Sequence, residues 1–245
     1  MKICITGASR GLGRALCRAC IAVGHTVWGV ARNEGKLKEM EQELGGSRFL
    51  RSAVDIARET SVLAWRGAME GRGFTPDVVI LNASVQSDDL LEGGYDSERG
   101  RQMIDVNLSG SLRCIGILLP AMLRRAVGSF VAITSTAMLR PSIRSAAYAS
   151  SKAGIAMAMR SLDLQYNHRG VRFQTVCLGP IATEMWEGRR NMLVPSPEKA
   201  AKAIAAFIAT RKSVLYYPLL TTTLLRLSLW LPDSVFAAVS GKVMK

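Results

Sequence analysis

The sequence predicts an α/β fold: a doubly wound, parallel seven-stranded sheet with helices on both faces. Short apolar runs alternate with helix-length segments from residue 1 to residue 217. Such alternation is typical of parallel sheets, whose crossover connections place helices on each face. A glycine-rich segment follows the first run, and the 245 residues are 49% apolar and 21% charged, as in folded globular proteins.

The expected strands, in chain order, are residues 3–6, 26–31, 48–54, 78–82, 129–134, 172–178 and 214–217. The expected helices are residues 13–23, 36–44, 60–70, 100–123, 147–167 and 197–210. The chain shows no repeat and no low-complexity linker before about residue 211. We therefore expect residues 1–217 to form one Rossmann-like catalytic domain and residues 218–245 to form a C-terminal helical extension.

The chain is strongly basic, with 32 Lys and Arg against 19 Asp and Glu, a net charge of +13. This balance favours anionic partners. The basic residues are scattered from Lys2 to Lys245 and aromatic residues make up only 6%. Nucleic-acid readers cluster these residues, so we expect no nucleic-acid partner.

Five cysteines, an odd number, occur in a chain without a signal-peptide pattern, which indicates a reducing, cytoplasmic location. Cys17 and Cys20 form a C-x-x-C pair, but a structural zinc site needs a second pair of ligands. We therefore expect small apolar residues on a helix face and no metal.

The segment Thr6-Gly-Ala-Ser-Arg-Gly-Leu-Gly13 joins the first strand directly to the first helix. Glycines at such a turn let the backbone approach a pyrophosphate, and the helix N-terminus supplies N–H groups and partial positive charge. The position, at the first strand-to-helix turn of a doubly wound fold, is the context that supports a dinucleotide site. The candidate residues in this loop are Gly7, Ser9, Arg10, Gly11, Leu12 and Gly13.

The catalytic candidates follow this loop in the order Asn107, Ser135, Tyr148 and Lys152. Tyr148 and Lys152 are four residues apart at the start of a helix, so their side chains share one face. A tyrosine has a pKa near 10, and a nearby cation favours its phenolate. With the Gly-x-x-x-Gly-x-Gly loop, this set resembles the short-chain dehydrogenase/reductase family in its single-domain form, over about residues 1–217.

The resemblance implies hydride transfer between a nicotinamide and a carbonyl or alcohol. Tyr148 would be the acid/base at the carbonyl oxygen and Ser135 would hydrogen-bond that oxygen. Lys152 would bind the nicotinamide ribose and lower the pKa of Tyr148, and Asn107 would position a water in the proton relay. This is general acid catalysis beside a hydride donor.

The resemblance also implies further cofactor contacts, at Asp55, Ile56, Asn82, Ala83, Pro180, Ile181 and Thr183, besides Tyr148 and Lys152 themselves. Two positions depart from the family pattern. The chain has Asn82-Ala83-Ser84 where Asn-Ala-Gly is usual, so Ser84 replaces the glycine. Gly179-Pro180 inverts the usual Pro-Gly. The first adds a side chain beside the cofactor, and the second moves the fixed φ of proline by one residue.

The second strand ends in Ala31-Arg32-Asn33, without the carboxylate that holds the ribose 2′-OH of NAD. Arg32 and Arg10 are instead suited to a 2′-phosphate, because a guanidinium matches phosphate oxygens. We therefore expect NADP(H), with Arg32 and Asn33 at the adenosine end. Because of this preference we expect carbonyl reduction; oxidation of an alcohol and a non-catalytic NADP(H)-binding regulator are the alternatives.

In the family the segment after the sixth strand closes the substrate pocket, and here residues 184–195 are largely apolar. Met185 and Trp186, with Ser135, are the substrate candidates. An apolar ketone or aldehyde is expected, with arginines in the segment suited to an anionic carrier. A loop that packs only on its own domain is the alternative.

The C-terminal extension is too interrupted to span a membrane, since Pro218, Arg226 and Pro232 fall within or beside its apolar run. A short helix is expected instead, with Leu220, Leu224, Leu227 and Leu231 on one stripe. A helix apolar on nearly all sides must be covered by something. We favour packing against the protein or the partner subunit of a homodimer or homotetramer; peripheral contact with a membrane surface and a substrate lid are the alternatives.

Overall fold

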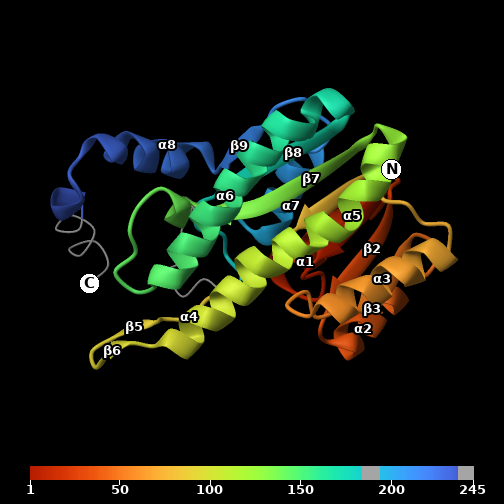
Figure 1. The fold of residues 1–245 in the computed structure, drawn as a ribbon, viewed down its shortest axis with the longest axis horizontal. Coiled ribbons are helices and arrows are strands. Elements are labelled where there is room, and N and C mark those ends of the chain that lie inside the picture. The colour runs from red at the N-terminus through yellow and green to blue at the C-terminus, as the bar shows by residue number, and fades with distance from the viewer. Residues whose placement is uncertain (184–193, 237–245) are drawn as a thin grey trace.

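The computed structural model describes residues 1–183 and 194–236 of the chain. Its centre is the expected seven-stranded, entirely parallel sheet (Figure 1), and its strand order is β3-β2-β1-β4-β7-β8-β9. The strands are β1 (Lys2–Thr6), β2 (Thr26–Ala31), β3 (Phe49–Ala53), β4 (Val78–Leu81), β7 (Gly128–Ser135), β8 (Val171–Leu178) and β9 (Val214–Tyr217).

Helices cover both faces of this sheet. On one face lie α1 (Gly11–Ala22), α2 (Glu34–Leu44) and α7 (Pro197–Phe207). On the other lie α3 (Glu59–Gly71), α5 (Ser111–Arg125) and α6 (Ala146–Tyr166). Each layer has its own core. Leu16, Met40 and Ile204 belong to the first, and Trp65, Met122 and Met159 belong to the second.

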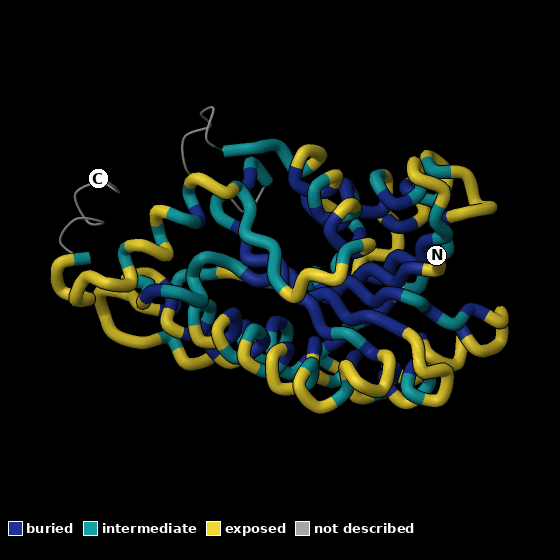
Figure 2. Tube along the Cα trace, turned by 90° about the horizontal axis from the view of Figure 1, so that it is seen from above, coloured by how far each residue is buried: buried dark blue, intermediate teal, exposed yellow. Residues whose placement is uncertain are grey.

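The alternation of side chains along the strands produces these two cores. In β1, Ile3 and Ile5 enter the core with α1, whereas Cys4 enters the opposite one. Successive residues of a strand point to opposite faces, so a run that is apolar throughout is buried on both sides. Figure 2 shows the strands as the buried centre of the molecule.

The strand order reverses between β1 and β4, because the chain runs outward through β2 and β3 before it returns to β4. In open α/β sheets the crevice at such a reversal, outside the carboxyl ends of the strands, is where ligands bind. The glycine loop follows β1 and Asn82 follows β4, so both lie at this crevice.

The expected helix 100–123 is longer and interrupted. It consists of α4 (Ser97–Ile104), a π-helical turn η1 (Asp105–Gly110) and α5. By length and composition this helix could cross a membrane. It instead supplies Cys114, Leu118 and Met122 to the core, so it is a core helix. A short hairpin of β5 (Leu90–Leu91) and β6 (Gly94–Tyr95), which the sequence did not predict, precedes it.

The C-terminal extension begins with the short helix that the sequence predicts. Helix α8 (Leu219–Leu227) continues into a 3-10 turn, η4 (Ser228–Trp230). Leu231 follows the helix and does not share its stripe. Figure 1 shows this extension projecting beyond β9 at the end of the molecule opposite α3.

Candidate active site

The glycine loop is tied to the end of β4 by the side chains of Thr6 and Asn82. Thr6 Oγ1 accepts the backbone N–H groups of Asn82 and Ala83, both at 3.0 Å. Asn82 Nδ2 donates to the carbonyl oxygens of Thr6 and Gly7, at 2.9 and 3.2 Å. The side chain of Asn82 therefore holds the two edges of the crevice together.

The glycines of this loop are required by close approach. A Cβ on Gly13 would lie 2.0 Å from the carbonyl oxygen of Gly7, and one on Gly7 would lie 2.8 Å from the Cα of Ala83. Gly11 has a φ of +49°, which favours glycine, and Thr183 Cβ is 3.7 Å from the position of its missing Cβ. Thr183 therefore lies across the crevice from Gly11, as a shared cofactor site requires.

The N-terminus of α1 faces this crevice without a side-chain cap. Arg10 is its N-cap in extended conformation, no side-chain cap bond is made there, and the first turn holds no acidic residue. Uncapped N–H groups and the helix dipole suit a phosphate. The loop, the uncapped helix and Thr183 thus fit the pyrophosphate and nicotinamide ends of a dinucleotide.

Arg32 is exposed at the end of β2 and makes no ion pair with a carboxylate among the described residues. Asn33 is the N-cap of α2, where its Oδ1 accepts the N–H of Lys36 at 2.9 Å. Its side chain therefore has a structural role that the sequence analysis did not assign. Arg32 remains available for an anion at the end of β2.

Seven other cofactor candidates differ in how far their side chains are exposed. Leu12, Ile56 and Ile181 have buried side chains in the two cores. Asp55 Oδ1 accepts the N–H of Ala57 at 3.0 Å, which shapes the turn after β3. Ser9, Ala83 and Pro180 are partly exposed. Met185 and Trp186 lie outside the described residues.

The catalytic candidates converge at the carboxyl end of β7. Ser135 ends β7, and Tyr148 and Lys152 lie in the first two turns of α6. Lys152 is buried, and its Nζ donates to the carbonyl oxygen of Ile133 at 3.0 Å. The same Nζ lies 5.6 Å from the centroid of the Tyr148 ring. The shared helix face that the spacing predicts is thereby confirmed.

Burial dominates the electrostatics of this pair. It raises the pKa of Tyr148 above its usual value, an effect that a hydrogen bond with Ser135 opposes. It lowers the pKa of Lys152 to about 8. Both shifts follow from desolvation, which disfavours both charged forms, and the effect of Lys152 on the pKa of Tyr148 stays a prediction. The Tyr148 hydroxyl is thus protonated at neutral pH and is a proton donor.

Asn107 lies in the π-helical turn, and its buried amide bonds to the loop after β4. Oδ1 accepts the N–H of Val85 at 2.8 Å, and Nδ2 donates to the carbonyl of Val85 at 2.9 Å. Nδ2 also donates to Ser151 Oγ of α6 at 3.2 Å. Asn107 therefore joins the loop to the catalytic helix, and its role at a relay water stays a prediction.

Asp89 is a buried residue at this site that the sequence analysis missed. Its carboxylate oxygens accept the N–H groups of Ala146 and Ala147, both at 2.8 Å. Ser145 Oγ accepts the N–H of Tyr148 at 3.2 Å. All three leading N–H groups of α6 are thus capped. Ser145 could have been found, because a serine directly before a helix is a typical N-cap; Asp89 could not, being 57 residues from Ala146.

Ser84, the departure from the usual Asn-Ala-Gly, places a hydroxyl group beside the crevice. Its Oγ is buried and has no hydrogen-bond partner among the described residues. A buried hydroxyl without a partner is costly.

No group of three or more metal-ligating side chains occurs in residues 1–183 and 194–236, and Cys17 and Cys20 are both buried on α1.

Known proteins resemble this chain over about three quarters of its length. The family model described as short chain dehydrogenase matches residues 1–193. The 3-oxoacyl-[acyl-carrier-protein] reductase FabG of Salmonella typhimurium is 32% identical over 74% of this chain and 73% of its own. The L-fucose dehydrogenase of Mus musculus is 29% identical over 76% of this chain and 67% of its own.

Solved structures show the same fold. A short-chain dehydrogenase from Streptomyces avermitilis has a TM-score of 0.83 and 25% identity, covering 98% of this chain and 95% of that one. The closed form of serine dehydrogenase, complexed with NADP+, has a TM-score of 0.83 and 22% identity, covering 88% and 94%. By its glycine loop, its Ser135, Tyr148 and Lys152 cluster and these matches, the chain belongs to the short-chain dehydrogenase family of oxidoreductases.

Proposed function

We propose that the protein is an NADPH-dependent reductase that converts an apolar ketone or aldehyde into an alcohol. The observation that supports this most is the position of Tyr148. Its protonated hydroxyl is hydrogen-bonded to Ser135, with the buried Lys152 ammonium behind its ring. A protonated tyrosine is the form that donates to a carbonyl oxygen.

The residues of the chain divide the chemistry among them. Bound NADPH supplies the hydride. Ser135 Oγ holds the carbonyl oxygen, and the Tyr148 hydroxyl donates its proton to that oxygen as negative charge develops. Lys152 stabilises the resulting phenolate, because an ammonium favours the charged form of its neighbour. Asn107 and Asp89 hold α6 so that Tyr148 meets the substrate in a fixed orientation.

The cofactor preference rests on the end of β2. Arg32 is exposed there, and no carboxylate occupies residues 31–33. A guanidinium pairs with a phosphate in a planar, bidentate way. The glycine loop, the uncapped N-terminus of α1 and Thr183 would hold the remainder of the dinucleotide.

The substrate class follows from the apolar segment after β8 and from the relatives. Residues 184–195 contain Met, Trp, Leu and Val with interspersed arginines. Relatives at 32% identity are named as 3-oxoacyl-[acyl-carrier-protein] reductases. We therefore place 3-oxoacyl thioesters on an anionic carrier first among the substrates to test.

We also propose that the protein is a homodimer or homotetramer in the cytoplasm, without a nucleic-acid partner.

The test is NADPH consumption against apolar ketones, apolar aldehydes and 3-oxoacyl thioesters, with Tyr148→Phe as the matched control. We expect turnover that the variant abolishes while it still binds NADPH. Turnover only with an alcohol and NADP+ would instead favour the oxidative direction. NADPH binding without any turnover in the wild type would favour the non-catalytic regulator.

A further inference from the structure

Helix α8 carries its polar residues inward and its leucines outward. Thr222 is fully buried, and Thr221, Leu225 and Ser228 are partly buried. Outward, the exposed fractions are 58% for Leu220, 59% for Leu224 and 60% for Leu227. These three residues recur at the spacing that places them on one helix face. A surface helix of a soluble protein has the opposite arrangement, apolar inward and polar outward.

The inward polar residues are satisfied within the protein. Thr222 Oγ1 lies 2.7 Å from the carbonyl oxygen of Pro218, and Ser228 Oγ lies 2.6 Å from that of Leu225, so both hydroxyls donate to the backbone. Thr221 Oγ1 packs against the backbone of Gly179, 2.9 Å from where a Cβ would stand. These two hydrogen bonds lie within the helix, so the side of α8 that faces the domain is set by the packing of Thr221 against Gly179 and by the full burial of Thr222.

The apolar surface continues beyond the helix. Trp230 is 89% exposed, and Leu219, Leu229, Leu231 and Val235 are also exposed. We call the exposed apolar side chains of residues 219–235 the apolar face: Leu219, Leu220, Leu224, Leu227, Leu229, Trp230, Leu231 and Val235. Figure 2 shows the chain here as mostly exposed, in contrast to the buried sheet. Contiguous exposed apolar surface of this kind marks a site of contact.

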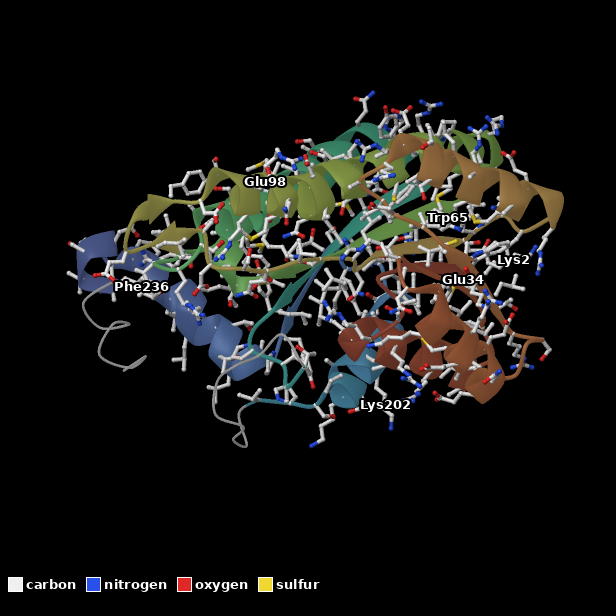
Figure 3. All side chains as sticks on the ribbon, turned by 90° about the horizontal axis from the view of Figure 1, so that it is seen from below. Lys2, Glu34, Trp65, Glu98, Lys202 and Phe236 are labelled. Carbon is white, nitrogen blue, oxygen red and sulfur yellow. The ribbon has the colours of Figure 1, made fainter. Side chains whose placement is uncertain are left out.

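Arg140 links the apolar face to the end of the domain that carries Ser135. The side chain of this buried arginine pairs with Asp233 at 2.5 Å, donates to the carbonyl of Leu231 at 2.9 Å and lies over the ring of Phe236 at 4.8 Å. Phe236 is labelled at the end of the tail in Figure 3. Arg140 is five residues beyond Ser135, in the loop that joins β7 to α6. Arg140 therefore connects the apolar face to the segment that directly follows Ser135.

The sequence of the C-terminal extension has more basic than acidic residues. Residues 218–245 contain Arg226, Lys242 and Lys245 but a single acidic residue, Asp233. Arg140 neutralises Asp233. Arg226 lies at the border of the face, over the ring of Tyr216 at 4.3 Å. With a net charge of +13, the whole chain is attracted to anionic surfaces.

We infer that the apolar face inserts into the interfacial region of an anionic lipid bilayer, so that the enzyme is a peripheral membrane protein. An outward stripe of leucines, a largely exposed tryptophan and the arginine at the border of the face are features of helices that lie in the membrane interface. Tryptophan prefers the headgroup level. This inference does not depend on the reductase activity. It reverses the order of the alternatives from the sequence, because the inward face of α8 is largely polar.

The test is flotation of the full-length protein with vesicles of phosphatidylcholine, with and without phosphatidylglycerol. We expect the protein to float with the anionic vesicles and high salt to weaken this. The double variant Leu224→Glu/Leu227→Glu should reduce the bound fraction by about tenfold or more, since it removes two apolar contacts and adds two repelled charges. Leu63→Glu, on α3 at the opposite end, is the control and should bind like the wild type.

A second readout covers the case in which the double variant fails to fold. Acyl chains brominated near the headgroup should quench the fluorescence of the wild type, and Trp230→Phe should remove most of that quenching. Absence of flotation and quenching in the wild type would overturn the inference. So would equal binding of the folded double variant. Conversion of a dimer to a monomer by the double variant, without vesicle binding, would assign the face to a second copy of the chain.

Discussion

The carboxylate of Asp89 accepts the backbone N–H of Ala147 at 2.8 Å, directly before Tyr148. Its other oxygen accepts the N–H of Ala146, and its own N–H donates to the carbonyl of Arg144. Asp89 is fully buried. The loop after β4 therefore determines where α6 begins, and with it the orientation of Tyr148.

Replacing Asp89 by alanine should lower both stability and activity. Two N–H groups, one of them buried, would lose a charged acceptor, so we expect the free energy of unfolding to fall by about 1–3 kcal/mol. The first turn of α6 would loosen, and kcat should fall more than KM for NADPH rises. Urea unfolding and steady-state kinetics measure these effects.

Asp96→Ala is the matched control, since Asp96 Oδ1 caps α4 through the N–H of Arg99 at 3.0 Å. This variant should lower the free energy of unfolding while kcat stays at the wild-type value. Asp89→Asn keeps one acceptor and should recover part of the lost kcat. Equal loss of kcat in Asp89→Ala and Asp96→Ala would show that Asp89 acts only through general stability.

The pH dependence of reduction should report Lys152. Burial lowers its pKa to about 8, so the free enzyme carries the ammonium below pH 8 and loses it above. Burial raises the pKa of Tyr148, which stays protonated throughout this range. We therefore expect kcat/KM for NADPH to decrease above about pH 8. Lys152→Arg keeps its charge at all these pH values, so its slower reaction should not show this decrease.

Arg32→Asp should change the cofactor preference. A carboxylate at this position repels the 2′-phosphate of NADPH and accepts the 2′-OH of NADH. We expect the ratio of kcat/KM for NADPH to that for NADH to fall by more than about tenfold. Arg48→Asp makes the same charge change at the amino end of the neighbouring strand β3, away from the carboxyl ends of the strands, and should leave the ratio unchanged. An unchanged ratio in Arg32→Asp would remove Arg32 from the site.

Ser84→Ala should stabilise the ligand-free protein. The Ser84 hydroxyl is buried without a partner among the described residues, and removing it relieves a desolvation penalty of about 1 kcal/mol. A thermal melt should show a higher Tm than the wild type. Ser87→Ala, in the same loop, is the control and should leave Tm unchanged. A lower Tm for Ser84→Ala would mean that the hydroxyl is satisfied in solution.

The sequence by itself predicted most of the fold, because periodicity and turn residues are local signals. The strands β2 and β9 have the predicted bounds, and the other sheet strands differ by one or two residues at their ends. The glycine loop and the spacing of Tyr148 and Lys152 are local as well. The interruption at Asn107 was missed, because a π-helical turn has no apolar period of its own.

The tertiary structure decided the contacts between residues far apart in the chain. Asp89 meets Ala147 across 58 residues, and Arg140 meets Asp233 across 93. The sequence pattern of α8 shows a leucine stripe but not which way it points. That direction depends on Thr221 and Thr222 packing inward against Gly179. Hydrophobic periodicity identifies a helix face, whereas its partner is determined only when the distant elements pack together.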